Sequence, residues 1–188
     1  MKMPAKSRVL PSIAGALRSV GYDTEFLYGG DKNFTNMNSY FLATGYNRVL
    51  GDVDFPAEMR KTSPWGVCDH LMFDQLRQNI DRQPKDKPWF KTLLTLSSHE
   101  PWTVPYKRLD DPMLNAFAYL DESLGKFMEG LRRSPEWKNT LVIILPDHGV
   151  RGRPTSMSST HENTTSRSFG QEVPCATQER WRAFAIKP

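Results

Sequence analysis

Apolar residues recur at helical spacing in three segments of the chain, residues 7–21, 69–82 and 112–133. The third segment has the clearest pattern, because its large apolar side chains fall on one stripe and most of its charged side chains fall off it. That stripe consists of Phe117, Leu120, Leu124, Phe127, Met128 and Leu131. We predict a helix over each segment, and a further helix over residues 33–44, which Gly45 closes.

Short runs of β-branched, aromatic or aliphatic residues separate these segments. They cover residues 24–28, 46–50, 89–96 and 140–145. The last run is continuous and aliphatic, which is typical of a strand buried on both faces in the middle of a parallel sheet. Strands that alternate with helices of these lengths predict an α/β fold. We expect a three-layer sandwich with a mostly parallel central sheet and helices on both faces.

The periodic pattern ends near residue 150. Residues 151–188 show neither the helical nor the strand period and are rich in serine and threonine. A segment of this kind buries too little apolar surface to offset the entropy of ordering it. We therefore predict one domain over residues 1–150 and a disordered or aberrant tail over residues 151–188.

Composition and charge narrow the classes of function. The chain has 188 residues, with 25 basic and 21 acidic side chains and a net charge of +4. Basic and acidic residues are interspersed, as in Lys85-Asp86-Lys87, whereas nucleic-acid binders gather their basic residues along a stripe. We expect no nucleic acid partner. The longest aliphatic run, residues 141–145, is too short to span a bilayer. Cys68 and Cys175 lie too far apart in sequence to suggest a zinc knuckle or a disulfide scaffold.

Three of the predicted strands lead directly into polar loops. These loops are Gly29-Gly30-Asp31, Ser97-Ser98-His99-Glu100 and Asp147-His148-Gly149. In an open parallel sheet, ligands bind beyond the carboxyl ends of the strands. If the strands are parallel, all three loops open at one edge of the sheet, and we expect an active site there.

The loop at Asp147 and His148 carries the strongest indication of chemistry. A carboxylate and an imidazole are oxygen and nitrogen ligands that suit zinc or manganese. The alternative is that Asp147 caps a helix and that His148 makes an ordinary surface contact. The pair alone does not decide between these interpretations.

His99 has two interpretations as well. A histidine in a strand-end loop can donate to an anionic group or act as a general acid or base, or it can hydrogen-bond to backbone alone. No Gly-x-Ser-x-Gly motif surrounds Ser97, which argues against a serine hydrolase. The stretch at Gly29-Gly30-Asp31-Lys32 lacks the full pattern of a phosphate-binding P-loop.

Several motifs together resemble those of a known family. They are Phe26-Leu27-Tyr28-Gly29-Gly30-Asp31 with Phe34 and Asn36, Trp65-Gly66 with Asp69, Leu94-Thr95-Leu96-Ser97-Ser98-His99, Ala118-Tyr119-Leu120-Asp121 with Leu124, and Val142-Ile143-Ile144-Leu145-Pro146-Asp147-His148-Gly149. In this order they resemble the catalytic domain of the lipoteichoic-acid-synthase-like phosphoglycerol transferases. That family is a sulfatase-like branch of the alkaline phosphatase superfamily.

The resemblance implies a mixed α/β sandwich and a set of site residues. Asp147 and His148 would be ligands of one divalent metal, with manganese expected first and zinc, magnesium or calcium as alternatives. His99 would contact the phosphate or glycerol of the substrate, and Asp31 and Tyr28 in the first motif are further candidates for substrate contacts. The substrate would be a phosphoglycerol- or sulfate-bearing lipid or glycan, typically the glycerophosphate head group of a membrane lipid.

The resemblance also implies what this chain lacks. In the family, a metal-activated threonine attacks a phosphodiester and forms a covalent phospho-threonine intermediate. That threonine lies upstream of the segment matched here, so we assign no catalytic nucleophile to this chain and expect a fragment that is inactive alone. For the tail, we put forward a truncated or frame-shifted coding region, and a family-like continuation in another reading frame would support this hypothesis.

Two other functions remain open from the sequence. One is a sulfuric ester hydrolase of the same superfamily, and the other is a non-catalytic α/β module that binds an anion or a lipid head group through His99. The family also implies a domain at the cell membrane, facing outside or the periplasm. The start of this chain has no export signal, so the chain alone is predicted to be cytoplasmic.

Overall fold

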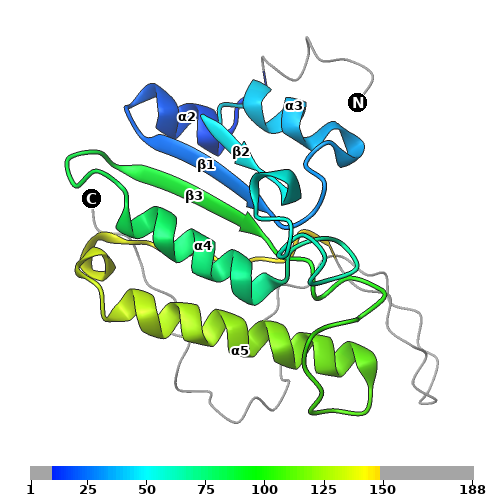
Figure 1. The fold of residues 1–188 in the computed structure, drawn as a ribbon. Helices are drawn as coiled ribbons and strands as arrows, with labels where there is room; N and C mark the ends of the chain where they lie inside the picture. The colour runs from blue at the N-terminus through cyan, green and yellow to red at the C-terminus, as the bar shows by residue number, and fades with distance from the viewer. Residues whose placement is uncertain (1–9, 149–188) are drawn as a thin grey trace, which may run out of the picture. The chain divides into compact units, whose positions relative to one another are not determined.

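Figure 1 shows the computed structural model of the chain, which describes residues 10–148. The chain divides into two units, Met1–Trp137 and Lys138–Pro188. Within the described residues, every strand and α-helix lies in the first unit. The predicted tail, residues 151–188, lies outside the described residues.

The elements of the first unit match most of the predicted segments. The helices are α2 (Ile13–Ser19), α3 (Met37–Ala43), α4 (Asp69–Asp81) and α5 (Pro112–Arg132), and the strands are β1 (Asp23–Tyr28), β2 (Arg48–Leu50) and β3 (Trp89–Leu94). Short 3-10 turns cover Phe34–Asn36, Asp52–Asp54 and Pro135–Asn139. Four helices and three strands predicted from periodicity are therefore confirmed.

The three strands form a parallel sheet in the order β2-β1-β3. Helices α2 and α3 lie on one face of this sheet, whereas α4 lies on the other face and α5 packs against α4 (Figure 1). The chain passes from β1 to its neighbour on one side through α3, and then to the other side through α4. This arrangement confirms an α/β fold with a parallel sheet and helices on both faces.

Local sequence explains where the two long helices begin. The side chain of Asp111 accepts a hydrogen bond from the backbone N–H of Leu114 at 3.0 Å and so caps α5, and Pro112 occupies its first turn. Helix α4 starts at an acidic residue, Asp69, which suits the positive end of the helix dipole. Along α4, the apolar side chains that are buried lie at helical spacing, at Met72, Phe73, Leu76 and Ile80.

Each face of the sheet has its own buried contacts. On the face of α2 and α3, Phe26 stacks on Phe41 with ring centroids 3.8 Å apart, and Tyr46 packs edge-on against both rings. Leu27 is the next residue along β1, so its side chain points to the opposite face, where α4 packs. Leu27 is fully buried.

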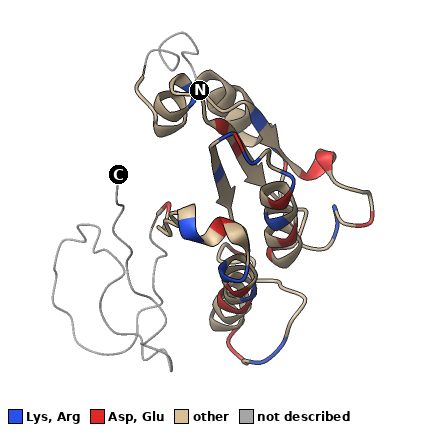
Figure 2. Ribbon diagram, turned by 90° about the vertical axis from the view of Figure 1, so that its left-hand side faces the viewer, with Lys and Arg blue, Asp and Glu red and all other residues tan. Residues whose placement is uncertain are grey.

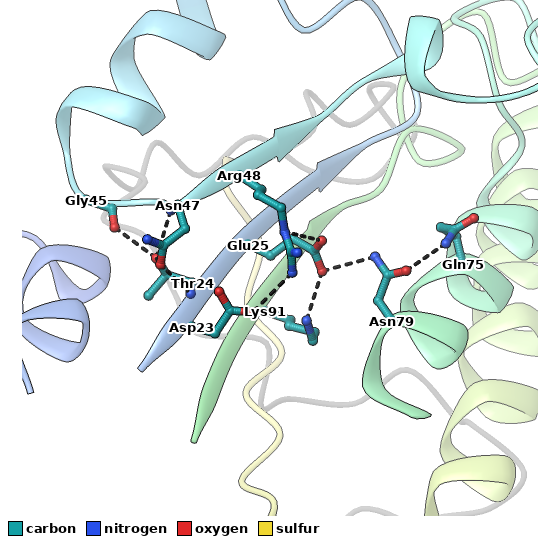
Figure 3. Close-up of polar contacts among 9 residues, drawn as sticks. All are labelled: Asp23, Thr24, Glu25, Gly45, Asn47, Arg48, Gln75, Asn79 and Lys91. Carbon is teal, nitrogen blue, oxygen red and sulfur yellow. Dashed lines mark hydrogen bonds and ion pairs between the residues drawn. The ribbon is translucent and has the colours of Figure 1, made fainter. Parts of the chain in front are cut away.

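A row of charged side chains crosses the face of the sheet that α4 covers (Figure 3). We call Arg48, Glu25 and Lys91 the charge row, because Glu25 stands in register with Arg48 on β2 and with Lys91 on β3. The Lys91 Nζ atom lies 3.0 Å from one carboxylate oxygen of Glu25, and the Arg48 Nε atom lies 3.3 Å from the other.

Glu25 and Lys91 are the buried members of the charge row, whereas the Arg48 side chain is 54% exposed, and Glu25 is also hydrogen-bonded to helix α4. The amide of Asn79 donates to Glu25 at 3.0 Å and accepts from Gln75 at 2.7 Å (Figure 3). The Glu25 and Lys91 side chains are 3% and 1% exposed. A slip of one residue in strand register would move Glu25 to the opposite face and leave Lys91 buried without its carboxylate. The charge row therefore specifies how the three strands pair.

One predicted strand is wrong. Residues 140–146 form neither helix nor strand. Most side chains of this run are exposed, with Ile143 at 67%, Ile144 at 57% and Leu145 at 72%. A strand needs a hydrogen-bonding partner as well as apolar residues, and hydrophobicity alone does not supply one. The prediction of a strand buried on both faces is corrected accordingly.

Charged side chains elsewhere in the described residues do not form a patch of one sign that would mark a functional site. Basic and acidic residues are mixed along the described helices and loops (Figure 2). None of the helices within residues 10–148 is long and apolar enough to cross a membrane. The topology of the sheet is the better guide, and it points to the loops that follow β1 and β3.

Candidate functional site

The chain adds its second strand on one side of β1 and its third strand on the other side, so the winding of the sheet reverses between β1 and β3. Connections to the two neighbours of β1 run over opposite faces of the sheet, so β1 and β3 flank a topological switch point. In open α/β sheets, ligands bind in the crevice outside the carboxyl ends of the strands at such a point. Residues 29–31 follow β1 and residues 95–100 follow β3. Two of the three predicted loops are thus brought to the same edge of the sheet.

Glycines allow the loop after β1 to contact the loop before α4. The backbone N–H of Val67 donates to the Gly29 carbonyl oxygen at 2.8 Å. A Cβ atom on Gly29 would lie 2.5 Å from the Val67 carbonyl oxygen, and one on Gly66 would lie 2.2 Å from the Gly29 carbonyl oxygen. Gly66 also has a φ of +137°, which favours glycine. Neither position accepts a larger residue without a backbone shift.

The first residue of α4 holds the loop after β3. Asp69 is 1% exposed. Its carboxylate accepts hydrogen bonds from the backbone N–H of Leu96 at 3.0 Å and from that of Ser97 at 2.8 Å. Burial raises the pKa of the Asp69 carboxyl, although these hydrogen bonds act to lower it. The beginning of the His99 loop is therefore fixed by a buried side chain from a different element.

His99 lies at the turn that follows. Its backbone N–H donates to the Leu96 carbonyl oxygen at 3.0 Å, and its Nδ1 lies 2.8 Å from the Glu100 carbonyl oxygen. The indole Nε1–H of Trp65 donates to the same Glu100 oxygen at 2.8 Å. The Trp65 and His99 rings meet edge-on, with centroids 5.2 Å apart. The imidazole is thus fixed on one side while its side chain remains exposed.

A small pocket is lined by side chains from these segments. Its lining includes Trp65, Cys68, Asp69, Ser97, His99 and Tyr119. The Cys68 thiol donates to the Thr62 carbonyl oxygen at 2.7 Å, and burial raises the pKa of this thiol. Cys68 therefore lines the pocket as a protonated thiol at neutral pH. The Tyr119 hydroxyl lies 2.6 Å from Nδ1 of His70, and burial raises the pKa of Tyr119. His99 is the exposed titratable group of this lining.

Tyr28 and Asp31 lie at the neighbouring strand end. The Tyr28 ring is 6% exposed and belongs to the core cluster that contains Phe26 and Leu96. Burial, followed by the nearby charges of Asp31 and Asp52, raises the pKa of Tyr28. Asp31 is exposed, and its carboxylate accepts a hydrogen bond from the Asn33 N–H at 2.8 Å. The pocket at His99 is lined by other residues than these two.

Asp147 and His148 belong to the second unit. Both side chains are about two-thirds exposed, at 66% and 63%, and a carboxylate oxygen of Asp147 lies 3.8 Å from Nε2 of His148. The other carboxylate oxygen accepts from the His148 backbone N–H at 2.9 Å. Residues 10–148 contain no cluster of three or more His, Cys, Asp or Glu side chains that could hold a metal. Two exposed donors do not fit a complete metal site.

Sequence reasoning gave no role to Trp65 or Asp69. Both residues stand in the motifs that resemble the family, but neither residue type alone indicates its contacts. An aspartate at the first position of a helix is ordinarily explained by the helix dipole. Its long-range hydrogen bonds to Leu96 and Ser97 become visible only when α4 is placed beside β3.

The parallel sheet and the strand-end loops define an α/β domain with a small pocket near its switch point. The family model described as Sulfatase matches residues 2–175 of this chain. The chain belongs to the sulfatase family. The match extends beyond the motifs of residues 7–149 at both ends, and proteins of the sulfatase and alkaline phosphatase superfamily generally depend on a divalent metal.

Among curated proteins, the chain is similar to lipoteichoic acid synthase 2 from Bacillus subtilis (strain 168). The two are 20% identical over 174 residues, which cover 87% of this chain and 26% of that protein. It is also similar to lipoteichoic acid synthase from Staphylococcus aureus (strain USA300), at 22% identity over 81% of this chain and 24% of that protein. The chain therefore spans about a quarter of the length of these relatives.

Solved structures support the fold. A protein of the alkaline phosphatase superfamily from Vibrio parahaemolyticus has a TM-score of 0.64 and 30% identity, covering 71% of this chain and 34% of that one. The lipoteichoic acid synthase LtaP from Listeria monocytogenes has a TM-score of 0.62 and 20% identity, covering 70% of this chain and 36% of that one. The predicted family and the predicted fold class are both confirmed.

Proposed function

We propose that this chain is part of a transferase or hydrolase that acts on phosphodiester or sulfate ester groups, and that it supplies a substrate-binding loop of that enzyme. The observation that carries the proposal is the placement of His99, which is fixed at the switch point of a sulfatase-family sheet beside a pocket. The similarity to lipoteichoic acid synthases supports a glycerophosphate-bearing lipid or glycan as substrate. The same similarity supports a location at the outer face of the cell membrane or in the periplasm.

Each candidate residue has a chemical role in this proposal. A protonated His99 donates to an anionic oxygen of the ester. A tyrosine hydroxyl is neutral at neutral pH, and burial raises the pKa of Tyr28 further, so we assign Tyr28 the role of a neutral hydrogen-bond donor. Asp31 carries a negative charge that repels phosphate, and it is therefore assigned to a hydroxyl of the substrate.

We assign Asp147 and His148 to the binding of a divalent metal, with manganese as the first candidate. A carboxylate and an imidazole suit manganese or zinc chemically, but the described residues provide these two donors without a third. The proposal therefore takes further ligands from residues outside 10–148, and it takes the nucleophile, as the resemblance implies, from a segment upstream of the matched motifs. Because a covalent nucleophile accounts for several orders of magnitude in rate, we expect this chain alone to be inactive.

The test combines turnover with metal binding. Turnover of bis(p-nitrophenyl) phosphate and of p-nitrophenyl sulfate is measured with the full 188-residue chain in manganese. We expect no turnover that depends on Asp147. Turnover that disappears in Asp147→Ala and persists in the matched surface variant Asp110→Ala would contradict the expected inactivity. Calorimetry with manganese alone should show weak binding that is lost in Asp147→Ala, and equal binding by this variant and the unmodified chain would refute the ligand assignment.

One observation favours a second candidate, a binding module without catalysis. The described residues build a pocket at His99 but no metal cluster. Such a module would bind phosphate-bearing lipid vesicles equally well in manganese and in a chelator. An enzyme whose metal helps to hold the substrate would lose affinity in the chelator, so this comparison separates the two candidates.

A further inference from the structure

Two side chains from separate loops share one backbone acceptor. Trp65 comes from the loop before α4 and His99 from the loop after β3, yet the Trp65 Nε1 and the His99 Nδ1 atoms each lie 2.8 Å from the carbonyl oxygen of Glu100. A carbonyl oxygen has two lone pairs and accepts both hydrogen bonds. The two aromatic rings are also in edge-on contact.

The chemistry of the acceptor determines the tautomer of the imidazole. A carbonyl oxygen cannot donate, so Nδ1 of His99 must carry the proton in this contact. A ligand would therefore contact the other ring nitrogen, Nε2, which donates only when the ring is protonated. Fixing one nitrogen by a hydrogen bond in this way is how proteins choose which nitrogen meets a ligand.

We propose that Trp65 is a positioning residue, which holds the Glu100 carbonyl and the His99 ring so that Nε2 of the protonated ring donates to an anionic oxygen of a phosphate or sulfate ester. The inference rests on the proposed function, because that function makes His99 the substrate contact. Trp65 acts through His99, and its own contact with a substrate is not required.

Both partners of the shared carbonyl are attached to fixed parts of the fold. On the Trp65 side, Ser63 and Gly66 exchange backbone hydrogen bonds at 2.9 and 3.2 Å, and Gly66 fits closely against the Gly29 carbonyl. On the His99 side, Asp69 holds the backbone of Leu96 and Ser97. The imidazole is thus tied to the carboxyl ends of both β1 and β3, which is where a ligand at the switch point binds.

Imidazole nitrogen shifts of the nitrogen-15-labelled, 188-residue chain test the proposal directly. At a pH where His99 is neutral, we expect its Nδ1 to be protonated and its Nε2 to be unprotonated. In Trp65→Phe, which keeps an aromatic ring but lacks the indole N–H, both nitrogens should move toward the averaged shifts of a mixed tautomer. Trp137→Phe, a tryptophan change on the turn after α5, should leave the His99 shifts unchanged.

Two results would overturn the positioning role: a neutral His99 ring in the unmodified chain that carries its proton on Nε2 and not on Nδ1, or the same His99 shifts in Trp65→Phe as in the unmodified chain. If Trp65→Phe does not fold, 3-benzothienylalanine at position 65 keeps the shape of the ring without its N–H, and the same shifts are expected to change. Backbone amide spectra establish folding in each case.

A titration with inorganic phosphate separates this inference from the proposed function. We expect His99→Gln to lower phosphate affinity by about tenfold or more, and Trp65→Phe to lower it by about three- to tenfold, as loss of one or two modest hydrogen bonds implies. Unchanged affinity in His99→Gln would refute the binding role of His99. The nitrogen shifts would then still decide whether Trp65 fixes the tautomer of His99. Unchanged affinity in Trp65→Phe, with a loss in His99→Gln, would refute the positioning role.

Discussion

Two segments of this chain look alike in sequence and differ in structure. Residues 89–99 and 140–148 are each an apolar run followed by a polar loop with a histidine. The first forms β3, in register with β1, and Asp69 and Trp65 hold the loop that follows it. The second forms no strand, and most of its aliphatic side chains are exposed. The difference shows that contacts from distant residues, and not the local pattern, turn a loop into a candidate site.

The largest expected effect concerns the buried charge within β3. Lys91→Met removes a cation from the charge row and leaves Glu25 buried with one charged partner fewer. We expect the free energy of unfolding to fall by about 3–5 kcal/mol, measured by urea denaturation. Lys138→Met, at an exposed lysine in the second unit, should change it by less than about 0.5 kcal/mol. Equal effects would contradict the role given to the charge row.

The next largest change in the free energy of unfolding is expected when one apolar side chain is truncated in residues 89–99 and compared with one in residues 140–148. Leu96 is 9% exposed and packs in the core cluster, whereas Ile144 is 57% exposed. Leu96→Ala should lower the free energy of unfolding by about 2–4 kcal/mol, and Ile144→Ala by less than about 0.5 kcal/mol. Thermal and urea unfolding provide the measurement. A loss of several kcal/mol in Ile144→Ala would mean that residues 140–145 are buried after all.

The sequence was sufficient for whatever depends on local periodicity. The helical stripe of residues 112–133 and the β-prone runs at 24–28 and 89–96 predicted their elements, and alternation of the two predicted the fold class. The run at 140–145 failed because strand pairing is a long-range property that a hydrophobic run does not contain. The charge row was out of reach for the same reason, since each of its ion pairs joins residues that are distant in sequence.

The residues of the candidate site also differ in whether local sequence or long-range contacts reveal their role. His99 was found because a histidine at a strand end is recognisable in sequence, and Asp31 because it follows a glycine pair. Asp69 and Trp65 were assigned no role, since their importance lies in hydrogen bonds to backbone groups 28 and 35 residues away. A sequence shows which side chains carry chemistry more readily than it shows which side chains hold them in place.

Two aspartates, Asp69 at the start of α4 and Asp147 in the second loop, provide a smaller contrast. Asp69→Ala removes the acceptor for the buried backbone N–H groups of Leu96 and Ser97. We expect a loss of about 1–3 kcal/mol in the free energy of unfolding, and less than about 0.5 kcal/mol for the exposed Asp147→Ala. A near-zero effect at Asp69, measured by urea denaturation, would contradict its role in holding the loop.

The smallest expected effect is a dependence on pH. Because burial raises the pKa of Asp69 in the folded state, the folded chain retains this proton to higher pH than the unfolded chain does. The contribution of Asp69 to stability is complete below the unfolded pKa of about 4 and is lost as pH rises through the folded pKa. Asp69→Asn cannot titrate at this position, so the stability of the unmodified chain relative to Asp69→Asn should fall as the pH rises above about 4. A constant or rising difference would contradict the raised pKa.

The central claim is that the His99 loop, held at the switch point, is the part of this chain that binds the ester. Nuclear magnetic resonance of the full chain during titration with glycerol phosphate, without metal, tests this claim most directly. We predict that the His99 imidazole resonances shift on binding, and that His99→Gln loses the interaction while the matched variant His70→Gln retains it. Binding of glycerol phosphate to His99→Gln with the affinity of the unmodified chain would contradict the account.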